Sequence, residues 1–308
     1  MIKSIDKRKA FNYLLDIGYQ RNMSNRKICF GVYDPSSFNK ICLSQREPSL
    51  ELVISISEKL NISLEELEYY CVFEDPNEFR SIKNRFEYYR LLQDYKNIEL
   101  LYHNHKSKYQ SESSLGYYLF LWMKAIVEVT INHNYLYAEE ILIKIIKSRH
   151  PDFKIKQYKL FNFNETELDI LHDIAYSIYL GNHERYPESI SIYEQLINYM
   201  NSNNLQVNDM TLFPKFCYQV SYILIEEKKY KDARIYTDIG IEYAKKNLQI
   251  LKLPYLYRNL AIISINQNDE IKAASYFKKC IELFRVQGRN EDFLKAGLEF
   301  AKELGIKI

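Results

Sequence analysis

The chain has 308 residues, enough for two domains, and a formal net charge of only +2 at pH 7. Glycine (8) and proline (7) are too scarce for a strand-and-turn protein, whereas long stretches rich in Leu, Ile, Tyr and Lys favour helices. The five cysteines are scattered with no CxxC pair, which argues against a disulfide framework or a zinc site and favours buried thiols in a reducing compartment.

The first 67 residues carry the start signals of five short helices. Gly18 is a natural stop for the first, and Pro35 presets the backbone at the start of the third. Glu66 completes a capping box for the last helix. The residues expected to cap the five helices are, in chain order, Ser4, Ser24, Asp34, Ser49 and Ser63.

The third of these helices has one apolar and one polar face. Phe38 and Ile41 are three positions apart and are expected to face inward. Short polar and cationic side chains then face outward, and such groups can approach base edges and phosphates in a major groove. These outward residues are Ser36, Ser37, Asn39 and Lys40.

Charge is unevenly distributed along the chain. Residues 1–46, which we call the basic head, hold nine Lys or Arg against three Asp, whereas the remaining residues are slightly acidic overall. This asymmetry is expected if only the head meets a polyanion.

Residues 20–67 resemble the Cro/repressor-type helix-turn-helix. The resemblance depends on Met23-Ser24, residues 37–41, Arg46-Glu-Pro-Ser-Leu50 and residues 61–67. The chain departs from the pattern at Ile41-Cys42-Leu43-Ser44, where that fold usually has Ile-Glu-Arg-Gly, and at Asn25, which replaces a Gln. The resemblance implies DNA contacts from Arg21, Ser24, Asn25, Arg26, Lys27, Ser36, Ser37, Asn39, Lys40 and Arg46. The alternative is a helix-turn-helix used only for dimerisation or protein contact.

Beyond residue 75 the chain is repetitive. An aromatic residue followed three positions later by a small or aliphatic residue recurs, with the second members 40, 51, 44 and 40 residues apart. Such a pair lets the second helix of a hairpin approach the first closely. The pairs are Tyr95/Ile98, Tyr135/Ala138, Tyr186/Ser189, Tyr230/Ala233 and a weaker Glu270/Ala273, with matching small residues on the first helices at Ala175, Ser221 and Ala261.

This pattern resembles tetratricopeptide repeats, which stack into a superhelix whose inner surface comes mainly from the first helices. Aromatic side chains beside amides and a guanidinium suit an extended peptide, and Arg258 suits a terminal or side-chain carboxylate. The expected peptide contacts are His172, Asp173, Tyr176, Tyr218, Gln219, Tyr222, Arg258, Asn259 and Asn266. The plainer alternative is that the tyrosines pack on neighbouring helices and the amides are solvated.

Together, the two parts resemble the Gram-positive peptide-pheromone regulators of the Rgg/PlcR/PrgX/ComR kind, the RNPP regulators. The resemblance implies an all-α fold: a five-helix helix-turn-helix domain (1–70), a linker (71–79), and about five tetratricopeptide-like hairpins in a right-handed superhelix for peptide binding and dimerisation (80–308). It also implies a homodimer on double-stranded DNA with two half-sites about 34 Å apart. An amphipathic segment, 291–304, is expected to cap the repeats or join the dimer contact.

Other function classes have weaker support. His103-Asn-His105 lacks metal-ligand spacing, and no phosphate loop or catalytic motif occurs, so no catalytic residue, metal or cofactor is expected. Charges interrupt the N-terminus, and Lys124 and Glu128 interrupt the most apolar stretch, so we expect a cytoplasmic protein that does not contact a membrane. A repeat scaffold that inhibits a partner protein without binding DNA remains the main alternative.

Overall fold

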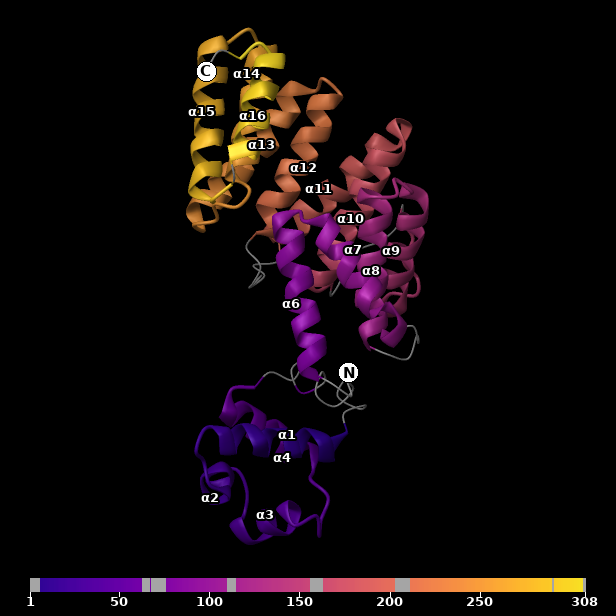
Figure 1. The fold of residues 1–308 in the computed structure, drawn as a ribbon, viewed down its shortest axis with the longest axis vertical. Helices are drawn as coiled ribbons and strands as arrows, with labels where there is room; N and C mark the ends of the chain where they lie inside the picture. The colour runs from indigo at the N-terminus through magenta and orange to yellow at the C-terminus, as the bar shows by residue number, and fades with distance from the viewer. Residues whose placement is uncertain are drawn as a thin grey trace. The chain divides into compact units, whose positions relative to one another are not determined.

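In a computed structural model of the chain, the described residues are 6–62, 67, 76–109, 115–155, 163–202, 211–289 and 291–306. Every regular element within these ranges is a helix, which confirms the all-α prediction (Figure 1). Contacts divide the chain into two compact units, residues 1–123 and 124–308. Within the described ranges, no helix combines the length and the apolar character that a membrane span requires.

Among the residues described at the start of the chain, four helices form a small bundle. Its core includes the fully buried side chains of Phe11, Ile28, Phe38 and Ile41, and the rings of Phe11 and Phe38 meet edge to face at 5.5 Å. Phe38 and Ile41 therefore face inward as predicted. The helices are α1 (Lys7–Gln20), α2 (Asn25–Cys29), α3 (Pro35–Cys42) and α4 (Leu50–Leu60).

The predicted caps are confirmed for three of these helices. Ser24, Asp34 and Ser49 each accept a hydrogen bond from a backbone N–H in the first turn of α2, α3 and α4. The first cap was predicted wrongly: Asp6 accepts the hydrogen bonds at the start of α1, and the predicted cap, Ser4, lies outside the described residues. The capping box predicted at Ser63 and Glu66 lies outside the described residues.

Gly18 does not end α1, contrary to the sequence prediction. The helix continues to Gln20, and a Cβ atom at position 18 would lie 2.5 Å from Cδ1 of Ile28 on α2. The glycine therefore permits a close approach between two helices. Helix α1 ends instead beside Asn22, whose φ of 57° is in the left-handed region.

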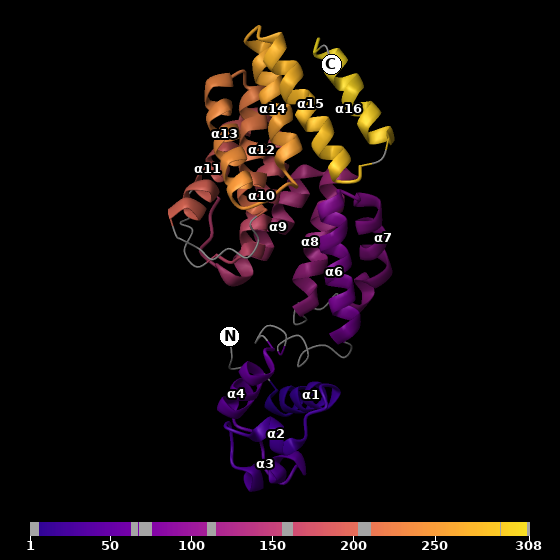
Figure 2. The ribbon, with the colours of Figure 1, turned by 90° about the vertical axis from the view of Figure 1, so that its left-hand side faces the viewer.

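The rest of the described chain forms successive helical hairpins (Figure 2). Short 3-10 turns, η2 (Lys106–Tyr109) and η3 (His183–Arg185), lie in two of the connections. The helices are α6 (Pro76–Leu92), α7 (Tyr95–His105), α8 (Leu115–Thr130), α9 (Tyr135–Arg149), α10 (Glu165–Gly181), α11 (Tyr186–Ser202), α12 (Leu212–Glu226), α13 (Tyr230–Lys246), α14 (Leu253–Asn266), α15 (Glu270–Val286) and α16 (Glu291–Glu303).

The repeat pattern predicts where these hairpins pack. Helices α7, α9, α11, α13 and α15 each begin at the first residue of a predicted pair. The second member of every pair is fully buried, as are Ala175, Ser221 and Ala261 on the facing helices. In one hairpin Ser189 Oγ donates to the carbonyl of Ala175 at 2.7 Å. The small residues therefore mark the points of closest approach between the paired helices.

The predicted C-terminal amphipathic helix is present as α16, which packs on α15. Leu294 and Ala301 are buried, and the ring of Phe293 meets that of Phe284 edge to face at 4.9 Å. Helix α16 therefore covers the last hairpin of the second unit.

Candidate DNA-binding and peptide-binding sites

Five of the predicted DNA contacts lie exposed around α2 and α3. Arg26 and Lys27 are on α2, Asn39 and Lys40 are on α3, and Arg46 follows α3. Helices α2 and α3 pack against each other. The fold therefore gathers four cationic groups and one amide on a small surface of the first unit.

Some of the other predicted contacts also hold the bundle together. The amide oxygen of Asn25 accepts a hydrogen bond from the hydroxyl of Tyr19 at 2.5 Å. Arg21 donates to the carbonyl of Leu60 at 2.5 Å, at the end of α4. Ser24 caps α2 by accepting from the N–H of Lys27. These three side chains therefore have roles inside the protein.

The two predicted serines at the start of α3 belong to its cap. Ser36 Oγ donates to Asp34 Oδ2 at 2.6 Å, and the N–H of Ser37 donates to the same oxygen at 2.8 Å. These hydrogen bonds lower the pKa of Asp34. The cap therefore fixes the start of the helix that carries Asn39 and Lys40.

A partly buried contact replaces part of the missing Ile-Glu-Arg-Gly motif after α3. Arg8 on α1 donates to the carbonyl of Ile41 at 2.8 Å and to that of Arg46 at 2.5 Å. Ser44, at the position usually held by glycine, has a φ of 57°. The departure in sequence therefore keeps the left-handed turn, and an arginine from α1 ties that turn to the bundle.

In the second unit, the predicted peptide contacts come from α10, α12 and α14, and α12 packs against both of the others. Four half-buried tyrosines and the buried Tyr255 connect the three helices. Ring centroids are 6.2 Å apart for Tyr176 and Tyr179, 6.3 Å for Tyr179 and Tyr222, 6.4 Å for Tyr222 and Tyr218, and 5.2 Å for Tyr218 and Tyr255. We call these five residues the tyrosine row. Burial, followed by the nearby Glu226, raises the pKa of Tyr222, so its phenol stays neutral.

At one end of the row, Arg258 is surrounded by aromatic rings. Its guanidinium carbon lies 5.6–5.9 Å from the ring centroids of Tyr218, Tyr222, Tyr255 and Phe300. One of its terminal nitrogens donates to the hydroxyl of Tyr218 at 2.9 Å. The buried Nε–H has no hydrogen-bond partner in the described part of the chain. The guanidinium of Arg258 therefore keeps one N–H that can donate a hydrogen bond to a carboxylate.

At the other end, His172 and Asp173 stand on α10. The hydroxyl of Tyr193 lies 3.0 Å from His172 Nδ1, and His172 Nε2 lies 3.7 Å from Asp173 Oδ1. Burial raises the pKa of Tyr193 well above its usual value. His172 is itself buried. The neutral phenol of Tyr193 therefore fixes the orientation of the His172 imidazole, whose other nitrogen faces the carboxylate of Asp173.

The three amide residues among the predicted peptide contacts are Asn259, Gln219 and Asn266, and the amides of Asn259 and Asn266 hydrogen-bond within the protein. Asn259 is fully buried and donates to the hydroxyl of Ser221 at 2.7 Å and to the carbonyl of Tyr218 at 3.2 Å. Gln219 is also buried. Asn266 is exposed, and its side chain accepts a hydrogen bond from Tyr230 at 2.9 Å. Asn259 is therefore a tie between α12 and α14, and its Oδ1 has no hydrogen-bond partner among the described residues.

Two members of the tyrosine row were missed by the sequence analysis. Tyr179 follows Tyr176 by three positions, and Tyr255 precedes Arg258 by three. Residues three apart share a helix face, so the same spacing rule applied to each predicted contact would have found both. Phe300 had no such signal because it reaches Arg258 from α16.

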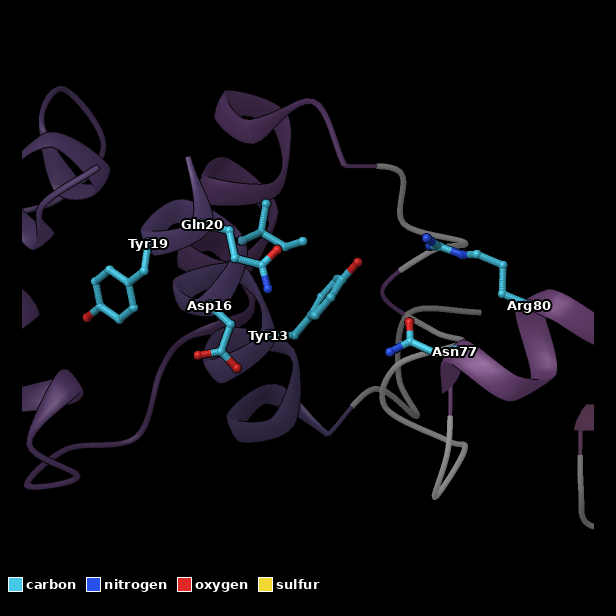
Figure 3. Close-up of a pocket in the computed structure, with 7 residues that line it drawn as sticks. Tyr13, Asp16, Tyr19, Gln20, Asn77 and Arg80 are labelled. Carbon is cyan, nitrogen blue, oxygen red and sulfur yellow. The ribbon is translucent and has the colours of Figure 1, made fainter. Parts of the chain in front are cut away.

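Other chemistry has little support. Figure 3 shows a hollow lined in part by Tyr13, Asp16, Tyr19, Gln20, Asn77 and Arg80, none of which is a predicted contact. His103 and His105 lie in the last turn of α7, 4.0 Å from Glu99 and 3.5 Å from Glu78, respectively. The described residues contain no group of side chains that could hold a metal ion.

No family model and no curated relative matches the sequence. Solved structures do match. PlcR of Bacillus thuringiensis in complex with the peptide PapR7 and DNA has a TM-score of 0.77 and 15% identity, over 97% of this chain and 100% of that one. The chain has the RNPP fold. ComR of S. thermophilus in complex with DNA and its signalling peptide ComS has a TM-score of 0.63, with 15% identity over 95% and 98% of the two chains. The pheromone receptor Rgg2 of Streptococcus dysgalactiae has a TM-score of 0.58, with 12% identity over 97% and 99%.

The RNPP fold accounts for both parts of the chain. Because the matches cover nearly the full length of each protein, the helix-turn-helix bundle and the tetratricopeptide-like hairpins occur in the same chain in all of them. The family resemblance predicted from the sequence is therefore confirmed at the level of the fold.

Proposed function

We propose that this protein is a cytoplasmic DNA-binding transcription regulator whose repeat domain binds a short signalling peptide that changes DNA binding or activation. We assign DNA binding to residues 1–70, a linker to 71–79, and peptide binding and dimerisation to 80–308. The observation that carries this proposal is an RNPP fold with cationic groups on α2 and α3 and a tyrosine-lined arginine on α14.

The exposed groups of the first unit support DNA binding. Lys40 and Asn39 stand one turn after the capped start of α3, and Arg26 and Lys27 stand on the helix before it. In a helix-turn-helix the second helix reads base edges while the surrounding cations contact phosphates. We therefore assign base contacts to α3 and phosphate contacts to Arg26, Lys27 and Arg46.

The tyrosine row supports peptide binding. Half-buried rings offer surface to apolar side chains at low entropic cost, and Arg258 offers a donor to a carboxylate. PlcR and ComR, which share the fold, have been solved with both DNA and a peptide. A peptide regulates DNA binding only if it binds two arrangements of a dimer with different affinity.

The DNA-binding part is tested with DNA from the protein's own promoter region. We expect binding that weakens steeply as salt rises, because several phosphate contacts release counterions. The double substitution Asn39→Ala with Lys40→Ala is expected to lower affinity, while Lys278→Ala, an exposed lysine of α15, serves as the control. If the wild-type protein does not bind, the regulator proposal is wrong and the scaffold alternative gains support.

The peptide-binding part is tested separately with variants of α14. Arg258→Ala is expected to abolish the response to peptide while DNA affinity stays unchanged. Asn259→Ala should do the same if its free oxygen meets the peptide, but should unfold α14 if its tie to α12 matters more. Circular dichroism separates the two outcomes.

A further inference from the structure

We propose that the peptide lies across α10, α12 and α14 in one direction, with its amino end at Asp173 and its free carboxyl end at Arg258. The proposal rests on the peptide binding proposed above, and adds the direction, the end-group chemistry and the length of the ligand.

The α14 end of the tyrosine row is positively charged. Arg258 has a buried Nε–H without a partner among the described residues. Two more cations lie against Tyr255: Lys252 Nζ is 5.3 Å from the centre of its ring, and Arg289 lies 3.5 Å from its hydroxyl. No ion pair between Arg258 and a carboxylate occurs in the described ranges. The guanidinium of Arg258 therefore has aromatic rings close to it, and its Nε–H is available to donate a hydrogen bond to an incoming carboxylate.

The α10 end carries a carboxylate, Asp173. Asp173 lies next to His172, whose imidazole is held in place by the contact between its Nδ1 and the hydroxyl of Tyr193. One turn earlier on α10, Asp169 accepts a hydrogen bond from Lys215 at 2.5 Å. The Asp173 side chain is 16% exposed. A peptide ammonium group is the complement of a carboxylate in this setting.

The separation of the two ends limits the length of the peptide. Helix α12 lies between α10 and α14 in both views and packs against each (Figures 1 and 2). Neighbouring helix axes are about 8–10 Å apart, so the outer two are separated by about 16–20 Å. An extended chain covers about 3.3 Å per residue, which gives about five or six residues between the two ends.

The middle of the path is aromatic. Tyr176, Tyr179, Tyr218 and Tyr222 lie between the two charged ends and are half-buried. Such rings bind apolar and aromatic side chains and leave their hydroxyls to pair with peptide main-chain groups. We therefore infer a ligand of about six residues with an apolar middle and two unmodified ends.

The test uses a pool of random hexapeptides made in three forms: with both ends free, with a C-terminal amide, and with an N-terminal acetyl group. Each pool is incubated with the full-length protein, and retained peptides are counted by mass spectrometry. We expect the free form to be retained about tenfold or more above either blocked form, because each block removes a charge-assisted hydrogen bond.

Variants assign each end to one helix. Arg258→Gln should remove the preference for the free carboxylate over the amide, and Arg258→Lys should keep part of it because the charge remains. Asp173→Asn should remove only the preference for the free amine. Each preference is the ratio of the free peptides retained to the blocked peptides retained by the same variant, so a general loss of stability does not change it. Lys278→Gln is the control that should change neither ratio.

Direction is read directly by photo-crosslinking. The best-retained hexapeptide is remade with benzoylphenylalanine at position 1 or at position 6. We expect position 1 to label α10 and position 6 to label α14 or α16, and the reverse result overturns the proposal. Retention that ignores both end groups overturns the orientation and leaves peptide binding intact, whereas no retention in any form overturns both.

Discussion

Ser44 shows how a single residue departs from a common pattern at a cost. Its φ of 57° is in the left-handed region, where residues with a Cβ are disfavoured by roughly 1–2 kcal/mol. Glycine adopts this conformation freely, but loses more entropy on folding. We predict that Ser44→Gly stabilises the first unit by about 0.5–1 kcal/mol. The measurement is hydrogen exchange of the α3 amides, with Gln45→Gly, at a residue without positive φ, as a control expected to destabilise.

Leu248 and Gly288 allow the same argument to be tested in both directions. Each is the second residue after the end of a repeat helix, α13 or α15, and their φ values are 56° and 71°. Leu248 is 87% exposed, so no burial offsets the strain. We predict that Leu248→Gly stabilises the second unit, whereas Gly288→Leu destabilises it by roughly 1–2 kcal/mol. Urea unfolding followed by circular dichroism measures both, and equal signs would contradict the prediction.

At the scale of elements, helix packing explains what the sequence revealed and what it did not. The close contacts between paired helices were predicted to the residue, since the small or aliphatic residues that make them recur along the chain. Gly18 was misread as a stop because its partner, Ile28, belongs to another helix. Helix ends depend on local signals, but the reason for a glycine inside a helix depends on what lies against it.

The contact between α1 and α2 can be tested with a pair of substitutions. Gly18→Ala places a Cβ against the buried Ile28, and we predict a loss of about 1–3 kcal/mol. Ile28→Val removes Cδ1, the nearest atom, so the double variant should recover part of the loss. Thermal unfolding of the four proteins gives the coupling energy. Purely additive effects would show that this contact is not the cause.

At the scale of the molecule, the concentration of positive charge in the basic head predicts that only this part of the chain contributes to the salt dependence of DNA binding. If the basic head alone meets DNA, the salt dependence of binding depends on its cations. We predict that replacing Arg26 and Lys40 by alanine lowers the slope of log K against log salt by about 0.9 for each phosphate that the variant no longer neutralises. The same change at Lys231 and Lys278, both exposed in the second unit, should leave the slope unchanged. Equal effects from both pairs would contradict the assignment.

The candidate sites show the limit of prediction from sequence over the whole chain. The predicted helix faces were informative because Tyr218, Tyr222 and Arg258 do meet across α12 and α14. The competing demands on Arg21 and Asn259 were hidden, since the partners of both lie 38 or more positions away. A sequence gives the face of a helix, but packing decides whether a polar group there is available to a ligand.

Arg258 and Asn259 also have a mechanical consequence. These adjacent residues of α14 hold Tyr218 of α12 at opposite ends, one through its phenol hydroxyl and the other through its main-chain carbonyl. A ligand that draws the guanidinium away removes the first link and leaves the second. Asn259, which also donates to the hydroxyl of Ser221, then still ties α12 to α14, so a ligand at Arg258 affects one of two adjacent links and leaves the other in place.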